Sequence, residues 1–371
     1  MKYVKALGIF LTLTVLVFLS CTHYQKVADV FLQPTFREKY ERNFTKGDTL
    51  FLKWKHSFEM VKNDSLVIKA PYTEQLYYSN SPNSARSYQV SIKNGEQLIC
   101  KVQKSDSLEG IFINILPLAP LNNVKPIDFL VTKKEENIQL DNPGTYQIIV
   151  QPEFAAFPYF NISFEIKPAY RFPVSGKNSK AIRSFWGAPR DGGKRSHKGI
   201  DIFAKRGTPV VAAVAGRISS TGNRGLGGKQ VWLRDGHRGY SLYYAHLDSI
   251  AVSGFQKVQV GDTLGFVGNT GNARTTPPHL HFGIYTNRGA IDPLLFVKER
   301  KEAKKWEITS DKETAQIKKG TNIRKGPGTS YAILETTTSS KKFMLLGKTT
   351  DWYRISLSED DYGFVHKSLV K

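Results

Sequence analysis

The chain is predicted to be mostly β, with an N-terminal β-sandwich, a central antiparallel β-sheet domain and a small C-terminal barrel. Short runs rich in Val, Ile, Tyr and Phe recur along its 371 residues, separated by Gly, Pro, Asn and Ser. Long apolar stripes of helical period are scarce. The length predicts two or three domains rather than one. Hydrophobic residues make up 40% of the chain and aromatic residues 12%, enough for packed cores.

The first 21 residues are predicted to be an export signal. Two lysines in the first five residues precede an uncharged run, Ala6 to Ser20, which ends at Cys21. This run of about 15 residues is short for a membrane span, which needs about 20. The segment Phe18-Leu19-Ser20-Cys21 resembles a bacterial lipobox, although Phe18 stands where Leu is usual. We therefore expect lipidation at Cys21, with an uncleaved anchor or an ordinary signal peptide as the alternatives.

The net charge of +21 predicts a polyanionic neighbourhood. Because the export signal argues against nucleic acid, we expect cell-envelope polyanions such as peptidoglycan, anionic glycans and lipid head groups. The lipobox favours an exported protein that is lipid-anchored to a membrane and faces the periplasm of a Gram-negative bacterium. If Cys21 is acylated, Cys100 has no intrachain partner. Cys100 is then most simply a small buried hydrophobe.

Residues 22–168 are predicted to form a β-sandwich of about eight strands. The run 87–92 precedes the hairpin-type pair Asn94-Gly95, and the run 144–150 is a second clear strand. The spacing in 85–166 resembles that of jelly-roll domains. No residue pattern there indicates chemistry, so we expect an interaction or spacer module. Residues 168–180 are predicted to be a linker.

The module 181–297 contains four histidines in distinctive contexts. In a strand that begins His279-Leu280-His281, both imidazoles lie on one face and Leu280 faces the core. In a second strand, the apolar residues that flank Asp201 lie on the face opposite to it, and His197 precedes this strand. A third strand, 240–247, is predicted to carry Tyr244 and His246 on one face.

These residues together predict a metal site, although each of them alone is commonplace. A single strand histidine is usually a surface residue or one whose hydrogen bonds are satisfied. Two His and one Asp with an open fourth position form a competent catalytic zinc set, and they can also hold Fe(II). The module contains six Asp and no Glu, so it cannot supply a His-Glu-x-x-His helix. Any general base must therefore be His, Asp or a metal-bound hydroxide.

Further short motifs fill the same module, residues 181–297. They include Phe185-Trp186-Gly187, Pro189-Arg190-Asp191-Gly192-Gly193, His197-Lys198-Gly199-Ile200-Asp201, Gly207-Thr208-Pro209-Val210, Ala213-Val214-Ala215-Gly216, Tyr244-Ala245-His246-Leu247, Val260-Gly261-Asp262, Gly268-Asn269-Thr270-Gly271 and Pro278-His279-Leu280-His281-Phe282. On these motifs the module resembles the lysostaphin/LytM-type peptidoglycan endopeptidases, the M23 metallopeptidases.

This resemblance implies a set of roles. By the family pattern, His197, Asp201 and His281 bind Zn²⁺, and His246 and His279 flank the metal-bound water as catalytic residues. Zinc lowers the pKa of bound water from about 15.7 towards 7. One histidine would take the proton of the water, while the other would hydrogen-bond the developing oxyanion and later protonate the leaving amine. Which histidine takes which role stays open.

A charged linker is expected at 298–314, followed by a small β unit at 315–371. The tail contains Asn322-Ile323-Arg324, Gly326-Pro327, Trp352-Tyr353 and Gly363-Phe364-Val365. This order resembles a bacterial SH3-type barrel, a class that commonly binds cell-wall peptide. Its aromatic residues are candidates for a peptide groove, although a domain of about 55 residues needs some of them in its core.

The expected function is hydrolysis of amide bonds in peptidoglycan stem peptides or cross-bridges by a zinc endopeptidase. Joining a catalytic module to a wall-binding module would raise the local concentration of substrate. The alternative is a non-catalytic wall-binding regulator of another murein hydrolase. The partners implied are peptidoglycan and, through the lipid anchor, a membrane, but no nucleic acid. The oligomeric state and the bond that is cut are not predicted.

Overall fold

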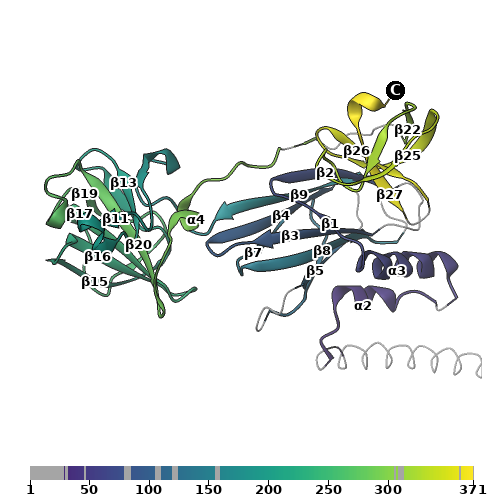
Figure 1. Cartoon of the computed structure of the whole chain (residues 1–371). Coiled ribbons are helices and arrows are strands. Elements are labelled where there is room, and N and C mark those ends of the chain that lie inside the picture. Colours follow the sequence, from purple (N-terminus) through teal and green to yellow (C-terminus); the bar gives the residue numbers. More distant parts are fainter. Residues whose placement is uncertain are drawn as a thin grey trace, which may run out of the picture.

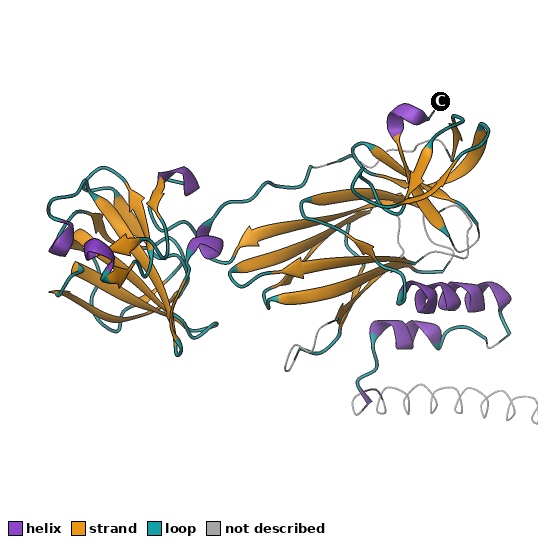
Figure 2. Cartoon of the chain, in the orientation of Figure 1, coloured by secondary structure: helices purple, strands orange, loops and turns teal. Residues whose placement is uncertain are grey.

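The computed structural model describes residues 29, 32–45, 47–78, 85–104, 110–118, 124–154, 159–304, 306–307, 313–358 and 361–370. The described chain is mainly strand in several antiparallel sheets, which confirms the predicted fold class. Figure 1 shows the central domain as one lobe, and the sandwich and C-terminal barrel side by side as another. Strands dominate both lobes (Figure 2). The export signal and Cys21 lie outside the described residues, and no described helix is long and apolar enough to cross a membrane.

The N-terminal sandwich consists of two facing sheets. One sheet has the order β1 (Leu66–Val67), β3 (Arg86–Ile92), β8 (Gly144–Pro152), β5 (Ile111–Pro117) and β6 (Ile127–Val131). The other contains β2 (Tyr72–Tyr77), β9 (Tyr159–Pro168), β4 (Glu96–Lys104) and β7 (Glu135–Leu140). Their inner faces share one apolar core, in which Tyr88 and Phe164 are fully buried. Cys100 is a buried free thiol in this core, as expected.

Two helices that were not predicted lie against the sandwich. They are α2 (Phe36–Glu41) and α3 (Thr49–Val61). Trp54 of α3 is buried against Phe112, and its indole nitrogen donates a hydrogen bond to the carbonyl of Pro152 at 2.9 Å. The segment from Thr35 to Glu38 forms a capping box at the start of α2. This Thr-x-x-Glu pattern is a local signal that could have revealed the first helix.

The C-terminal barrel continues one sheet of the sandwich. Its strands are β22 (Thr314–Ile317), β23 (Asn322–Arg324), β24 (Ile333–Thr336), β25 (Lys341–Lys348), β26 (Trp352–Ser356) and β27 (Tyr362–His366). Strand β25 pairs with β2, with Leu76 opposite Gly347. The barrel is therefore joined edge to edge to the sandwich, and Figure 1 shows the two packed together.

Aromatic residues of the barrel are buried at this junction. Phe364 is fully buried and belongs to the sandwich core, and Trp352 and Tyr362 pack against the same core. Tyr353 packs instead against the separate core of the barrel. Phe364 is thus unavailable to an external ligand, because its side chain fills the contact between the two modules.

The described part of the charged linker is extended and contacts the sandwich. The side chain of Arg300 pairs with Glu96, and the backbone N–H of Ala303 donates to Glu165 at 3.1 Å. No helix is present in the described residues of 298–314. These contacts hold the linker along strands β4 and β9.

The central domain is built on one twisted antiparallel sheet. Its order is β10 (Ile182–Ser184), β13 (Ile200–Phe203), β20 (His279–Thr286), β17 (Ser241–Ile250), β16 (Gly228–Asp235), β15 (Gly216–Arg224) and β18 (Lys257–Val258). Shorter elements border it: β11 (Pro189–Arg190), β12 (Arg195–Ser196), β14 (Pro209–Val211), β19 (Thr263–Val267), β21 (Gly289–Ile291) and α4 (Leu294–Val297). One face of β13, β16, β17 and β20 packs into the apolar core, which leaves the opposite face for polar groups.

Candidate metal and catalytic site

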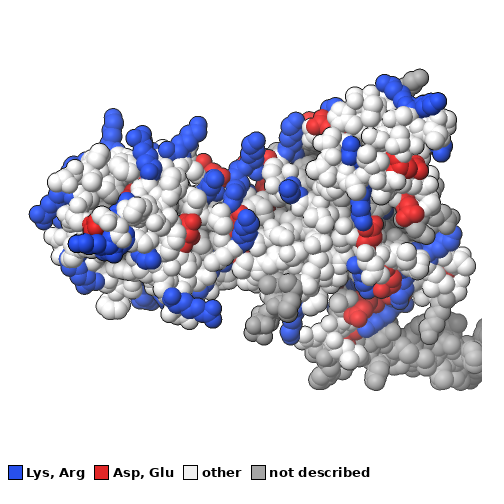
Figure 3. All heavy atoms as spheres, in the orientation of Figure 1, with Lys and Arg blue, Asp and Glu red and all other residues white. Residues whose placement is uncertain are grey.

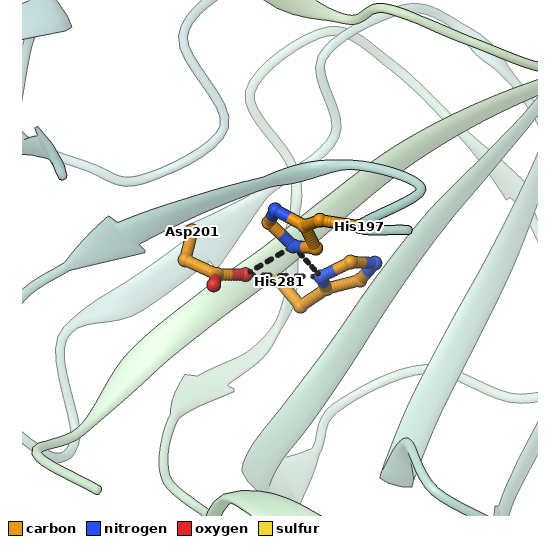
Figure 4. A group of neighbouring side chains, drawn as sticks. All are labelled: His197, Asp201 and His281. Carbon is orange, nitrogen blue, oxygen red and sulfur yellow. Dashed lines mark hydrogen bonds and ion pairs between the residues drawn. The ribbon is translucent and has the colours of Figure 1, made fainter. Parts of the chain in front are cut away.

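The antiparallel pairing of β13 with β20 places Asp201 directly opposite His281. Ile200 and Ile202, on either side of Asp201, are fully buried in the core. Because successive strand residues point to opposite faces, Asp201 projects from the other side of the sheet. His197 lies just before β13 and reaches the same place (Figure 4).

Three side-chain atoms of these residues converge. His197 Nε2 lies 3.0 Å from Asp201 Oδ1 and 2.9 Å from His281 Nδ1, and the third side of the triangle is 3.0 Å. Ligands around a tetrahedral zinc, at bond lengths of about 2.0–2.1 Å, lie about 3.3 Å apart. A slight widening of the triangle would therefore accommodate zinc. Within the described residues, this is the only group of three or more such side chains close enough to hold a metal ion.

Neighbouring groups orient two of the three side chains. His197 Nδ1 lies 2.9 Å from the carbonyl oxygen of Phe185. A carbonyl only accepts hydrogen bonds, so Nδ1 carries the proton and Nε2 presents its lone pair to the site. Asp201 Oδ2 accepts a hydrogen bond from Arg190 Nη2 at 2.8 Å, which leaves Oδ1 for the site. The same Arg190 nitrogen donates to Ser184 Oγ at 2.6 Å.

Electrostatics favour the protonation states that metal binding requires. Burial raises the pKa of Asp201, but the adjacent rings of His197 and His281 outweigh burial and hold this pKa well below its usual range. Burial also lowers the pKa of His281, against the attraction of Asp201. The site therefore offers an ionised carboxylate and a neutral imidazole, the forms in which these groups bind metals.

His246 and His279 line the same cavity of about 570 Å³ as the three converging residues. Each has its Nδ1 close to a backbone carbonyl, His246 at 2.9 Å from Thr270 and His279 at 2.8 Å from Pro277. In neutral imidazoles these contacts assign the proton to Nδ1 and leave Nε2 as a free acceptor. Burial, with the nearby His281 and His279, lowers the pKa of His246 to about 4.

The position of His246 depends on a β-bulge in β17. Ala245 and His246 together face the single residue Gln230 of β16, and the backbone of His246 has a positive φ of 61°. The prediction that Tyr244 and His246 share a face is therefore wrong. Tyr244 is fully buried in the core, where its hydroxyl accepts a hydrogen bond from the N–H of Ala213 at 3.0 Å. A residue with a side chain is strained at this φ, as is common where geometry serves a site.

The sequence analysis predicted no role for Arg190, although the segment 189–193 is one of the motifs that carry the family resemblance. Arg190 is close to Asp201 because β11 and β12 form a short hairpin beside the site. No local pattern reveals such a contact, since the two residues belong to separate elements.

Known proteins resemble parts of this chain. Residues 195–293 match the family described as Peptidase family M23, and residues 319–371 match the bacterial SH3 domain. The L-Ala--D-Glu endopeptidase of Bacillus subtilis (strain 168) is 36% identical over 131 residues, which are 33% of this chain and 40% of that protein. The uncharacterized lipoprotein YgeR of Escherichia coli (strain K12) is 38% identical over 107 residues, 29% of this chain and 40% of its own length.

A solved structure is also similar to part of this chain. The catalytic domain of the antimicrobial peptidase lysostaphin from Staphylococcus simulans is 33% identical, covers 31% of this chain and 89% of that one, and has a TM-score of 0.28. In both sequence relatives, the alignment spans less than half of the relative's length. The chain carries a domain of peptidase family M23, followed by a bacterial SH3 domain.

Proposed function

We propose that the protein is a zinc-dependent endopeptidase that hydrolyses amide bonds in the stem peptides or cross-bridges of peptidoglycan. The observation that carries this is the convergence of His197 Nε2, Asp201 Oδ1 and His281 Nδ1 in a cavity also lined by His246 and His279. These three residues would hold Zn²⁺, which activates water and polarises the scissile carbonyl when bound.

The two remaining histidines act as the proton carriers. His246 is neutral at neutral pH because its pKa is low, so its Nε2 is ready to accept the proton of the attacking water. In its charged form, with both ring nitrogens protonated, His279 hydrogen-bonds the developing oxyanion through Nε2 and passes that proton to the leaving amine; His246 then releases its proton to solvent and His279 takes one up, which restores the starting state. The carbonyl contacts at both Nδ1 atoms hold the rings in place throughout.

The surface charge supports an anionic polymer as substrate. Figure 3 shows many Lys and Arg side chains, and few Asp or Glu, over the visible face of the central domain. A peptide polymer with carboxylates is attracted to such a surface. The Bacillus relative is named for an L-Ala--D-Glu bond; the bond that this chain cuts is left to experiment.

The proposal includes attachment to the cell envelope. The lipobox-like segment that ends at Cys21 supports export and lipid anchoring, and one relative is named a lipoprotein. The mature chain would then carry the sandwich (22–168), the peptidase domain (181–297), the linker (298–314) and the barrel (315–371), facing the periplasm. Peptidoglycan is the proposed partner, and the membrane is reached only through the lipid.

Mass spectrometry of fragments released from purified sacculi tests this function. We expect the wild-type protein to release new peptide fragments, a chelator to stop the release, and added zinc to restore it. The matched variant His281→Ala should release none. Absent or chelator-insensitive release would contradict the proposal. Wall turnover undiminished by His281→Ala would favour the non-catalytic regulator, and iron without zinc in the purified protein would favour an iron site.

A further inference from the structure

Three aromatic residues form a cluster beside the metal site. Trp232 is on β16, Tyr243 on β17 and Tyr285 on β20, and all three are partly exposed. The ring centroid of Trp232 lies 4.4 Å from that of Tyr243 and 5.1 Å from that of Tyr285, and the two tyrosine rings are 6.2 Å apart. Their planes meet at 32°, 55° and 84°, so the rings are inclined to one another rather than stacked flat.

The cluster lies on the face of the sheet opposite the core. Five of the strand neighbours of the three aromatic residues are fully buried in the core, namely Val231, Leu233, Leu242, Tyr244 and Ile284. Strand alternation therefore sends the three rings to the face that carries Asp201 and His281. Among the described residues, the three rings are not part of that buried core. Filling the core of this domain therefore does not account for them.

The strand register places the cluster next to the metal ligands. Asp201, His281 and Ala245 lie side by side across β13, β20 and β17. Two residues further along the strands, the corresponding row contains Gly283, Tyr243 and Trp232. Two residues of a strand span about 6.6 Å, and the rings of Tyr243 and His281 are 5.8 Å apart. Tyr243 and Tyr285 also line the catalytic cavity.

The aromatic cluster is firmly held by its neighbours. Gly283 is covered on this face, because a Cβ atom there would lie 3.0 Å from the ring of Tyr285 and 3.2 Å from the carbonyl oxygen of Lys198, so the ring of Tyr285 packs directly on the strand. The hydroxyl of Tyr243 donates a hydrogen bond to the buried side chain of Gln230, which fixes the ring. The surface is therefore formed before a ligand arrives.

We propose that Trp232, Tyr243 and Tyr285 form a subsite for an alkyl side chain of the substrate, two residues from the bond that is cut. This rests on the proposed function, which places the reacting amide at the metal ligands. An extended peptide rises about 3.3 Å per residue and turns alternate side chains to the same side. When such a peptide runs along the strands from the metal ligands, its second residue beyond the amide reaches the row that contains Tyr243 and Trp232. There the inclined rings contact its C–H groups.

The test uses synthetic peptides around the bond that muropeptide analysis identifies. Glycine, alanine or norleucine is placed two residues from that bond, on either side in turn. The wild-type protein should prefer norleucine to glycine by about tenfold or more in kcat/KM on one side, the scale of discrimination that an apolar pocket provides. Trp232→Ala and Tyr285→Ala should lose most of this preference, whereas Trp232→Phe should retain part of it.

Phe255→Ala is the matched control. Phe255 is an aromatic residue of the same domain, 75% exposed, and it lines a different cavity beside β15 and β18. This variant should keep the wild-type preference. Equal use of glycine and norleucine by the wild-type protein on both sides of the bond would overturn the subsite. A preference unchanged in Trp232→Ala and Tyr285→Ala would overturn it as well.

Two further measurements distinguish the peptide subsite from a sugar site and from failure of the hydrolase itself. If the cluster binds a sugar ring, Trp232→Ala will weaken cleavage only of peptides that carry the disaccharide, which would overturn the peptide assignment. If the wild-type protein does not cleave sacculi, the proposed function fails by itself. Equilibrium binding of stem peptides that carry glycine or norleucine at each position in turn then tests the subsite in the wild-type protein, and equal affinity at every position would overturn it.

Discussion

The carboxylates of Glu74 and Asp201 lie in two polar clusters that differ in burial and in the groups around them. Glu74 lies between the sandwich and the barrel, where it and Arg354 are both 0% exposed. Asp201 lies in the peptidase domain beside an open cavity. Glu74 is bonded through both oxygens to Arg354, at 2.7 and 2.8 Å, and also accepts hydrogen bonds from Tyr72 and Tyr88.

The two clusters differ in the groups that face the carboxylate oxygens. The hydrogen bonds to the Glu74 carboxylate all come from donors that carry a hydrogen, so this carboxylate is satisfied without a metal ion. Asp201 has one oxygen held by Arg190, while its other oxygen faces ring nitrogens of His197 and His281. Because His197 Nε2 carries no hydrogen, it cannot donate to Asp201 Oδ1, and two such acceptors close together call for a cation. A closed donor set thus marks a structural ion pair, and a cluster of acceptors marks a metal site.

Removing one partner of the closed pair should have the largest effect on stability. Glu74→Ala or Arg354→Ala leaves a buried charge alone, which costs about 3–5 kcal/mol. Urea unfolding of the full chain measures this loss. The double replacement Glu74→Leu with Arg354→Met should cost less than either single change, because no unpaired charge remains. Single variants as mild as the double would show that neither charge depends on the other.

Acid should weaken the metal-free peptidase domain through His246. Its folded pKa of about 4 lies below the ordinary value of 6.5, so the unfolded chain takes up the proton first. The stability is complete above pH 6.5 and is lost as the pH falls towards 4, by at most about 3 kcal/mol. Unfolding with a chelator at pH 7 and pH 5 measures it. His246→Gln should show a smaller loss than the wild type; an equal loss would assign the effect elsewhere.

Arg190→Ala should lower zinc affinity by about 10–100-fold, the usual effect of removing a group that orients a ligand. Arg190 fixes Asp201 Oδ2 and so leaves Oδ1 to the site. Competition with a chromophoric chelator gives the affinity without any activity assay. Arg190→Lys should recover part of the affinity through a single hydrogen bond. Unchanged zinc binding in Arg190→Ala would show that Asp201 needs no such support.

An exposed ion pair should have the smallest effect on stability, and it serves as the reference for the buried pair of Glu74 and Arg354. Lys62, the residue that follows α3, pairs with Glu59 at 2.7 Å on the surface of the molecule. Lys62→Ala should cost less than about 1 kcal/mol in urea unfolding, because water and salt screen exposed charges. A cost near that of Glu74→Ala would mean that burial does not separate these pairs.

Much of the peptidase domain could be predicted from local patterns. The alternation around Asp201, and the spacing of His279 and His281, indicated which side chains leave the core. The same rule was wrong for His246, because the bulge in β17 reverses the alternation after Tyr244. Helices α2 and α3 were missed although α2 begins with a capping box. The barrel was predicted from its motifs, but its edge-to-edge pairing with the sandwich was not.

The amino-acid sequence by itself determined the β class, the apolar face of each strand and the group of His and Asp residues on the opposite face. These follow from the two-residue period of a strand, a steric property of neighbouring residues. Only the tertiary structure decided that Arg190 holds Asp201, that Arg354 meets Glu74, and that Trp232 joins Tyr285 beside the metal ligands. Each of these contacts joins separate elements, and the register and packing of those elements depend on the whole fold.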